Sequence, residues 1–257
     1  MKVLEPIWGT KAETASRLRG RLEAVLDWAT VRKYRTGENP ARWKGHLDTL
    51  LPARSKVARV QHFAALPWKD VGAFMKELSG QAGIGALALK FAILTAARSG
   101  EVRGMTWDEV DLDDHLWIVP AVRMKAGREH RIPLTPPAVA LLKELMPLRK
   151  PEESIVFPSI RDRKPLSDMT LTAVLRRMGR TDMTVHGFRS TFRDWAAEAT
   201  DYPAEMAEMA LAHTVSNKVE AAYRRGDMFD KRLKMMNDWA NMCSSLPPSI
   251  CQAAASD

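Results

Sequence analysis

The sequence predicts a mainly α fold with a small antiparallel β-sheet, an α+β fold. Segments with apolar residues at helical spacing occupy much of the 257-residue chain, and the clearest are 13–32 and the almost uniformly apolar 86–97. Two short segments rich in β-branched and aromatic residues, 116–120 and 130–134, flank a turn around Lys125, which is the pattern of an antiparallel hairpin. These observations favour a helical protein that contains one small sheet.

The first part of the chain contains one long amphipathic helix. Its apolar stripe over 13–32 is formed by Leu18, Leu22, Val25, Leu26 and Ala29. Three arginines lie off that stripe, namely Arg17, Arg19 and Arg21. The segment 36–40, Thr-Gly-Glu-Asn-Pro, ends this helix, and a short helix is predicted over 43–50. Because the periodicity fades in the basic stretch 52–59, we place a domain boundary close to residues 52–65.

The second part of the chain is predicted to carry helices before and after the sheet. A helix is expected over 68–78, and a short β-like segment at 110–112 precedes the hairpin. Pro133 has no N–H to donate, so its strand lies at an edge of the sheet or ends there. Further helices are predicted over 137–146, 167–178, 186–199, 204–211, 217–223 and 229–242. The tail 244–257 is expected to be disordered unless a partner holds it.

Positive charge is concentrated in the first part of the chain. The net charge is +8, and residues 1–66 carry 13 Lys/Arg against 6 Asp/Glu, whereas residues 67–257 carry 26 against 25. A basic module of this kind either binds a phosphate backbone or forms a solubilising surface, and the charge alone leaves both open. The candidate DNA-binding residues are Arg17, Arg19, Arg21, Arg54, Lys56 and Arg59.

Composition and motifs exclude several classes of protein. No apolar run approaches the roughly 18–20 residues that cross a bilayer, and the N-terminus lacks the apolar core of a signal peptide. The two cysteines, Cys243 and Cys251, have no zinc-like or redox-like partners, which favours a reduced, cytoplasmic protein. There is no Gly-rich phosphate loop, no pair of histidines at metal spacing and no Gly-x-Ser-x-Gly motif. We therefore expect no metal site.

Six polar residues carry the chemistry needed to break a phosphodiester. That reaction needs neutralised phosphate oxygens, an in-line nucleophile and an acid for the leaving oxygen. Guanidinium groups suit the first task because their planar fork matches phosphate oxygens. A tyrosine can attack once neighbouring cations help its phenol to ionise. In chain order, the six candidates are Arg98, Lys125, His186, Arg189, His213 and Tyr223.

Each of the six residues also has a purely structural interpretation. Arg98 could form an internal salt bridge with Glu101. Lys125 could be an ordinary surface lysine of a hairpin, with Arg123, Arg128 and Arg131 as nearby alternatives. A lone histidine is more often structural, and Tyr223 could lie on a helix surface. The ordered set, rather than any single member, favours the functional interpretation.

The ordered set resembles the active site of the tyrosine recombinases, the phage integrase family. Four strings are similar to the branch that contains the satellite phage P4 integrase and the prophage and genomic-island integrases. They are Ala64-Ala-Leu-Pro67, Thr95-Ala-Ala-Arg-Ser-Gly-Glu101, His186-Gly-Phe-Arg-Ser-Thr-Phe-Arg193 and Leu211-Ala-His213. The match runs from about Ala64 to about Met242 and implies a tyrosine-recombinase-like catalytic domain.

The resemblance implies a role for each matched residue. Tyr223 attacks the scissile phosphate and leaves a 3′-phosphotyrosyl link and a free 5′-hydroxyl. The phosphate is held by Arg98, Arg189 and His213. Lys125 protonates the leaving oxygen, His186 assists proton transfer, and Glu101 supports the site. Because the covalent link keeps the bond energy, neither ATP nor a metal nor any other cofactor is implied.

The resemblance also implies a domain organisation. Residues 1–60 resemble part of a helical core-type DNA-binding domain, 61–243 the catalytic domain, and 244–257 a disordered tail. Integrases of this branch usually carry an additional N-terminal arm-site-binding domain and the first core-binding helices, so the chain is expected to be N-terminally truncated. The implied partners are double-stranded DNA with an attachment site, three further copies in a homo-tetramer, and an excisionase or a host DNA-bending protein. No membrane is involved, and the expected location is the bacterial cytoplasm, at the nucleoid.

Three functions are therefore compared. The first is a site-specific recombinase that integrates or excises a mobile element. The second is a catalytically idle DNA-binding remnant of a decayed integrase, which would form no covalent adduct. The third is a topoisomerase of the related type IB chemistry, which would relax DNA without any attachment sequence. All six site positions are present, which favours the first.

Overall fold

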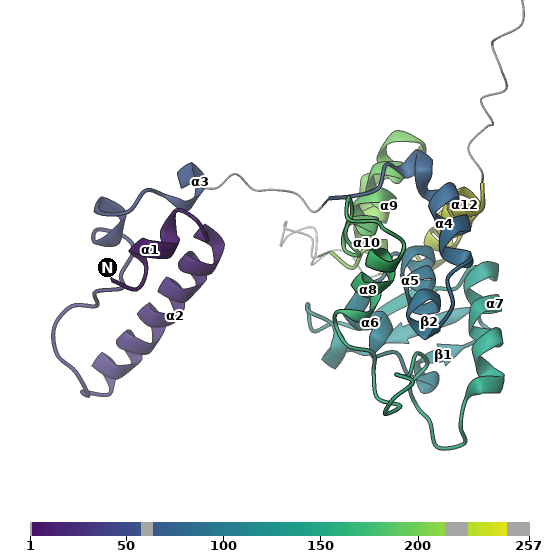
Figure 1. The fold of residues 1–257 in the computed structure, drawn as a ribbon, viewed down its shortest axis with the longest axis horizontal. Coiled ribbons are helices and arrows are strands. Elements are labelled where there is room, and N and C mark those ends of the chain that lie inside the picture. The colour runs from purple at the N-terminus through teal and green to yellow at the C-terminus, as the bar shows by residue number, and fades with distance from the viewer. Residues whose placement is uncertain (1, 58–63, 214–225, 246–257) are drawn as a thin grey trace, which may run out of the picture. The chain divides into compact units, whose positions relative to one another are not determined.

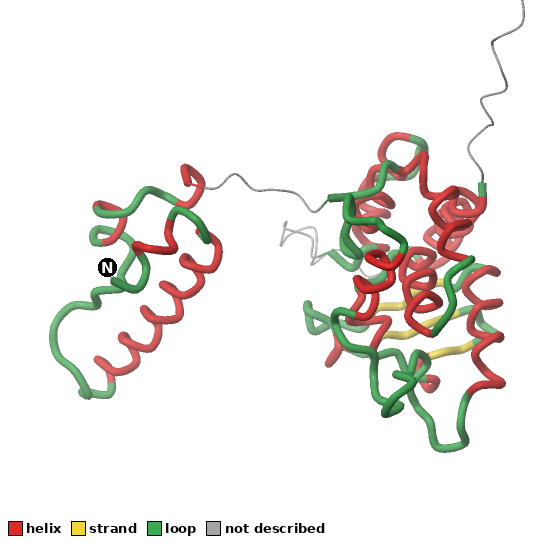
Figure 2. The backbone as a smooth tube through the Cα atoms, viewed as in Figure 1, coloured by secondary structure: helices red, strands yellow, loops and turns green. Residues whose placement is uncertain are grey.

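The computed structural model describes residues 2–57, 64–213 and 226–245 (Figure 1). The chain divides into two compact units, Met1–His62 and Phe63–Asp257. Both units are mainly helical, and the larger one contains a small three-stranded antiparallel sheet (Figure 2). The predicted α+β fold class is confirmed.

The smaller unit is built on the long helix α2 (Ala12–Val31), close to the predicted helix over 13–32. Helix α1 (Glu5–Trp8) packs against it, and α3 (Arg54–Val57) follows a single 3-10 turn at Leu47–Thr49. The buried cluster consists of Leu4, Trp8, Ala15, Leu47 and Leu51, and the Trp8 ring stacks on Trp43 at 5.4 Å between centroids. This cluster holds the unit together.

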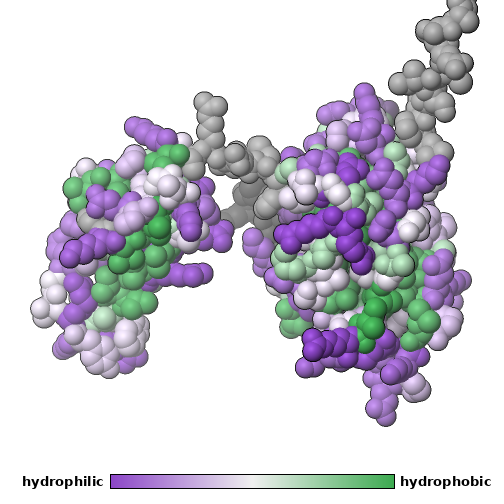
Figure 3. Space-filling view, in the orientation of Figure 1, coloured by the Kyte–Doolittle hydropathy of each residue, from purple (hydrophilic) through white to green (hydrophobic). Residues whose placement is uncertain are grey.

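Two expectations for the smaller unit differ from the structure. The helix predicted over 43–50 is wrong, because Gly45 adopts a left-handed backbone with φ of 71° and only the short 3-10 turn forms. The apolar stripe of α2 is not fully buried at any position: Val25 is 62% exposed and the other stripe residues are half-buried, whereas the buried residues of this helix are Ala12 and Ala15. A hydrophobic strip is visible along this unit (Figure 3).

The larger unit is arranged around helix α5 (Ile84–Thr95), whose Ala88, Leu89, Phe91 and Ile93 are completely or almost completely buried. The helices that pack against α5 are α4 (Val71–Ser79), α6 (Ser99–Arg103), α7 (Pro136–Leu145), α8 (Thr170–Arg177) and α12 (Phe229–Ser244). The remaining helices are α9 (Gly187–Glu198) and α10 (Ala204–Ala210), which pack against each other. The prediction of a buried core helix over 86–97 is confirmed.

The sheet has the strand order β1-β2-β3, with β1 at Val110–Asp111, β2 at Leu116–Val119 and β3 at His130–Pro133. All pairs are antiparallel, and Trp117 of β2 pairs with Ile132 of β3. Pro133 ends the edge strand β3, as expected from its missing N–H. The loop between β2 and β3 carries Lys125.

Several element boundaries also differ from the sequence expectation. Helix α8 begins at Thr170, three residues after the predicted start, and α6 was not predicted as a helix. The predicted helix over 217–223 and almost all of the tail 244–257 lie outside the described residues. Among the helices that the structure describes, none has the length and apolar character to cross a membrane.

A buried arginine connects the last helix to the sheet. The side chain of Arg232 in α12 is 1% exposed and donates to the carbonyl of Arg131 at 2.8 Å and to the carboxylate of Asp227 at 3.0 Å. His130 precedes Arg131 on β3, and its Nε2 lies 3.3 Å from the carbonyl of Ala210, at the end of α10. Through these contacts, β3 holds the ends of two helices.

His130 provides a test of this packing. Burial, with the charge of Arg232 adding to it, lowers the pKa of His130 from 6.5 to about 4. As the pH falls, the unfolded chain therefore binds a proton on His130 at a higher pH than the folded chain does. His130 costs no stability above pH 6.5, and it lowers the free energy of unfolding by up to about 3 kcal/mol as the pH falls from 6.5 to 4. Urea unfolding at pH 7.5 and pH 4.5 should show a smaller acid loss for His130→Gln than for the wild type. Equal losses would contradict the buried, neutral His130.

Candidate active site

The site begins where α5 ends. Ala96 adopts a left-handed backbone with φ of 51°, which stops the helix and turns the chain toward Arg98. Glu101 then accepts from the backbone N–H of Arg98 at 2.9 Å and from its Nη1 at 2.7 Å. The Nη2 of Arg98 donates to the carbonyl of Ala212 at 3.1 Å. The salt bridge considered above therefore exists, and it fixes a guanidinium that remains 25% exposed.

Arg189 lies deeper, in the first turn of α9, and is 5% exposed. Its Nη1 donates to the carbonyl of Ala96 and its Nη2 to the carbonyl of Leu211, both at 2.5 Å. Its Nε is buried without a hydrogen-bond partner among the described residues. Burial, with the charge of Arg98 adding to it, lowers the pKa of Arg189 to about 10. The group is therefore still a cation at neutral pH.

His213 follows α10 and is held at both ring nitrogens. Its Nε2 lies 3.2 Å from Nη2 of Arg189, and its Nδ1 lies 2.6 Å from Oε2 of Glu208. The other oxygen of Glu208 accepts from Nε of Arg193 at 2.6 Å. Burial works to raise the pKa of Glu208, but the hydrogen bonds and charges of His213 and Arg193 outweigh it and lower the pKa.

His186 occupies the N-cap position of α9, three residues before Arg189. Burial lowers its pKa, and the nearby charges of Arg189, Arg98 and His213 lower it further. Because the unperturbed value is about 6.5, His186 is neutral at pH 7 and able to accept a proton.

Close backbone packing holds the start of α9 in place. The N–H of Thr184 donates to the carbonyl of Ala64 at 3.0 Å, and the N–H of Gly187 donates to Oγ1 of Thr184 at 2.9 Å. A Cβ on Gly187 would lie 2.2 Å from the carbonyl oxygen of Ala64. Only glycine fits at this position without moving backbone.

These side chains converge on one pocket of about 310 Å³. Its lining residues are Arg98, Ser99, Gly100, Glu101, Arg123, Lys125, Val185, His186 and Arg189. Arg123 donates to the carboxylate of Glu109 and to the carbonyl of Glu101, and so holds the floor of the pocket. Lys125 comes from the exposed loop between β2 and β3. The pocket is therefore lined by four basic side chains and a histidine.

The structure brings together most, but not all, of the residues proposed from sequence. Arg98, Lys125, His186 and Arg189 share the pocket, Glu101 supports it, and His213 joins it through Arg189. Tyr223 lies outside the described residues. Glu208 and Arg193 were not proposed as site residues from sequence, and Arg123 was named only as an alternative to Lys125. Glu208 lies in α10, whereas His213 lies five residues later, beyond the end of that helix, so no helical spacing predicted that the two side chains would pair.

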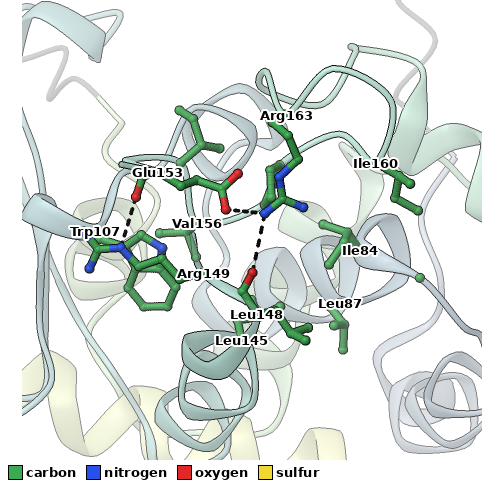
Figure 4. Close-up of a pocket in the computed structure, with 13 residues that line it drawn as sticks. Ile84, Leu87, Trp107, Leu145, Leu148, Arg149, Glu153, Val156, Ile160 and Arg163 are labelled. Carbon is green, nitrogen blue, oxygen red and sulfur yellow. Dashed lines mark hydrogen bonds and ion pairs between the residues drawn. The ribbon is translucent and has the colours of Figure 1, made fainter. Parts of the chain in front are cut away.

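A second pocket, of about 440 Å³, lies at the opposite end of α5 (Figure 4). Its walls are largely apolar, and Arg163 pairs there with Glu153 and donates to the carbonyl of Leu148. Arg149 lies over the Trp107 ring at 5.7 Å. No histidine, cysteine, serine or tyrosine lines this pocket, and the one carboxylate that lines it, Glu153, is paired with Arg163. Among the described residues, no cluster of three or more His, Cys, Asp and Glu side chains could hold a metal.

The basic side chains of the smaller unit are not equivalent. Arg17 pairs with Glu13 at 2.8 Å, and Arg54 pairs with the same carboxylate. Arg19 is 16% exposed and donates to Glu23 at 2.5 Å and to the carbonyl of Ala41 at 3.0 Å, so its guanidinium serves the internal structure. Arg21 and Lys56 are exposed, and Arg59 lies outside the described residues.

Comparison with protein families decides which family this architecture represents. The model of the phage integrase family matches residues 59–228, and that of the phage integrase central domain matches residues 1–46. The chain belongs to the phage integrase family. The resemblance to this family that the sequence motifs indicated is therefore confirmed.

Relatives place the chain in the P4-like branch. It is 31% identical over 250 residues to the integrase of Enterobacteria phage P4, a match that covers 90% of this chain and 55% of the relative. It is 33% identical over 239 residues to prophage integrase IntZ of Escherichia coli K12, covering 92% of this chain and 57% of the relative. The chain thus spans little more than half the length of these relatives.

Solved structures share the fold. A lambda integrase dimer bound to a COC′ core site matches with a TM-score of 0.58 at 20% identity, covering 88% of this chain and 78% of the other. The Tn1549 transposon integrase in complex with circular intermediate DNA also matches with a TM-score of 0.58, at 15% identity and with 87% and 78% coverage. A lambda integrase tetramer bound to a Holliday junction matches with a TM-score of 0.56 at 20% identity, and the match covers 84% of this chain and 63% of the other.

Gly187 offers a test of how the site is built. We expect Gly187→Ala to lower the free energy of unfolding by about 1–3 kcal/mol, because the new methyl group overlaps backbone that cannot move freely. The matched control is Gly80→Ala, whose Cβ would lie at an ordinary 3.4 Å from its nearest neighbour. Urea unfolding of both variants measures the difference. Equal midpoints would show that the close approach to Ala64 is not a constraint.

Proposed function

We propose that this chain is a site-specific DNA recombinase that breaks and rejoins DNA through a 3′-phosphotyrosyl intermediate and so integrates or excises a mobile element. The observation that carries the proposal is the convergence of Arg98, Lys125, His186 and Arg189 on one pocket, with His213 bonded to Arg189. These residues come from distant parts of the chain, and their chemistry is that of phosphoryl transfer. Membership of the phage integrase family supports the same conclusion.

In this proposal Arg98, Arg189 and His213 hold the non-bridging oxygens of the scissile phosphate. Each guanidinium already has part of its donor set fixed by protein carbonyls or a carboxylate. Positive charge is therefore oriented before DNA arrives, and little reorganisation is needed as negative charge develops in the transition state. The anchored Glu101 keeps Arg98 in place without entering the reaction.

Proton transfer is assigned to His186 and Lys125. The phenol oxygen of Tyr223 forms a bond to phosphorus while the bond from phosphorus to the 5′ oxygen breaks. His186, neutral at pH 7 because its pKa is lowered, assists removal of the phenolic proton. Lys125 gives a proton to the departing 5′ oxygen. Attack of a 5′-hydroxyl on the phosphotyrosyl link reverses these steps, so no cofactor has to supply energy.

We assign DNA contacts on the smaller unit to its basic side chains. Residues 1–60 act as a helical core-type DNA-binding domain, 61–243 as the catalytic domain, and 244–257 as a tail. Arg21 and Lys56 are exposed, and Arg17 and Arg54 share a single carboxylate, so this surface keeps an excess of positive charge. Because binding to this surface would neutralise DNA phosphates and release their counterions, the DNA affinity of the surface would fall as the salt concentration rises.

Assembly and location follow from the same proposal. The similarity to a lambda integrase tetramer on a Holliday junction supports a homo-tetramer on attachment-site DNA. Strand exchange in one direction would be set by an excisionase or a host DNA-bending protein. The protein would then work in the bacterial cytoplasm, at the nucleoid.

Trapping of a covalent adduct tests the proposal. We expect the wild type to form a protein–DNA adduct on a suicide duplex that carries a nick beside a candidate attachment sequence. Cleavage releases the short strand between the cleaved phosphate and the nick, and without that strand's 5′-hydroxyl the covalent link cannot be reversed. Tyr223→Phe should abolish the adduct. Tyr202→Phe should preserve it, because the Tyr202 hydroxyl donates to Asp238 at 2.5 Å and its pKa is raised to about 12 by burial and by that carboxylate.

Three other outcomes would contradict the proposal. DNA binding without any adduct would indicate an idle DNA-binding remnant. An adduct that persists in Tyr223→Phe would place the nucleophile elsewhere. Relaxation of supercoiled DNA irrespective of sequence would indicate a type IB topoisomerase.

A further inference from the structure

We propose that Glu208 is a positioning residue that sets the protonation of His213: it keeps a proton on Nδ1 and provides the counter-charge when Nε2 gains the proton needed to bind phosphate. This inference rests on the proposed function, because His213 is taken to contact the scissile phosphate. It adds a residue outside the set of six and assigns it a defined electrostatic task.

The contacts of His213 determine where its proton lies. A guanidinium N–H can only donate, so the Nε2 that lies 3.2 Å from Nη2 of Arg189 must offer a lone pair. The proton of the neutral ring is then on Nδ1, where the Glu208 carboxylate accepts it at 2.6 Å. In the DNA-free protein, His213 is thus an acceptor toward Arg189 and a donor toward Glu208.

Binding of phosphate requires a different state of the ring. A phosphate oxygen only accepts, so the Nε2 of His213 must carry a proton to bond with it. As phosphate draws the Arg189 guanidinium to itself, Nε2 loses its donor and takes a proton from solvent. The ring becomes an imidazolium with both N–H groups in use, and the Glu208 carboxylate lies against the new charge. The step is a proton transfer: an N–H bond forms at Nε2 and an O–H bond of hydronium breaks, which leaves water.

The surroundings make that counter-charge necessary. Within residues 2–57, 64–213 and 226–245, the titratable groups that interact with His213, Glu208 or Arg189 are Arg189 and Arg193 from α9, Arg98 and Glu101 at the start of α6, and His186 at the N-cap of α9. Three of these five groups are permanent cations, so a further positive charge is disfavoured without an adjacent anion. The lowered pKa of Glu208 keeps that carboxylate charged at neutral pH.

Glu208 is not needed merely to place the end of α10. Arg189 already binds the carbonyl of Leu211, Arg98 binds the carbonyl of Ala212, and His130 contacts the carbonyl of Ala210. The backbone before His213 therefore has three anchors from the core. What the carboxylate adds is the orientation and charge of the imidazole ring.

Two variants separate orientation from charge. In Glu208→Gln the amide oxygen can still accept from Nδ1, but the counter-charge is lost. In Glu208→Ala both are lost. The charge-matched control is Glu144→Gln, an exposed position on α7 outside the pocket.

The first readout needs no DNA cleavage. In protein labelled with 15N-histidine, the His213 resonances are assigned by comparison with His213→Gln. We expect a protonated Nδ1 and an unprotonated Nε2 in the wild type and in Glu208→Gln, and a mixture of tautomers in Glu208→Ala. A wild-type pattern in Glu208→Ala would overturn the orienting role even if the chain formed no DNA adduct.

The second readout is single-turnover cleavage of the suicide duplex between pH 5.5 and 8. At neutral pH we expect Glu208→Gln to be roughly 10–100-fold slower than the wild type, the range typical of losing a group that supports a catalytic one. Its deficit should shrink toward acid, because a higher proton concentration offsets the lost counter-charge, whereas Glu144→Gln should follow the wild type. A Glu208→Gln profile parallel to that of the wild type would overturn the counter-charge role.

Discussion

The buried guanidinium of Arg189 is the interaction on which the site depends. It joins the carbonyl of Ala96, just after α5, to the carbonyl of Leu211, just after α10, from its own place in the first turn of α9. Burying an arginine is costly unless its donors are satisfied, and here backbone carbonyls satisfy two of them. Because those carbonyls lie two residues before Arg98 and His213, the same contacts that stabilise the cation also position its neighbours. The fold and the site are therefore stabilised by one group.

A consequence is an excess of positive charge that the described residues do not neutralise. Glu101 pairs with Arg98, and Glu208 bridges His213 and Arg193, whereas the partners of Arg189 among the described residues are carbonyl oxygens and a histidine nitrogen. Burial, with the charges of neighbouring cations adding to it, lowers the pKa of Arg189 and of His186. A phosphodiester brings the missing negative charge. In the proposed function, these cations favour an anion, and they favour the transition state most, because negative charge builds up on the phosphate during attack.

Periodicity predicts the parts of this molecule that depend on local pattern. The core helix over 86–97, the long helix over 13–32 and the edge position of Pro133 follow from residue type and spacing. Contacts between distant residues do not: Ala96 and Arg189 are far apart in sequence, and nothing local indicates that an alanine carbonyl will bind an arginine. The helix expected over 43–50 failed because the left-handed Gly45 stops it. Arg19 stays a candidate for DNA contact, and its pairing with Glu23 could not be predicted, because an arginine off the apolar stripe can still fold back on its own unit.

The proposed role of Arg98 in neutralising the charge of the scissile phosphate is tested most directly with a DNA substrate that lacks this charge. Replacing one non-bridging oxygen of that phosphate by a methyl group removes its negative charge, and with it the need for a matching cation. Cleavage of the normal and the methylphosphonate duplex is measured for the wild type and for Arg98→Ala. We predict that Arg98→Ala is roughly 100-fold or more impaired on the phosphate, as for loss of one preorganised donor, and close to the wild type on the methylphosphonate. An equal impairment on both duplexes would show that Arg98 serves the structure and not the phosphate.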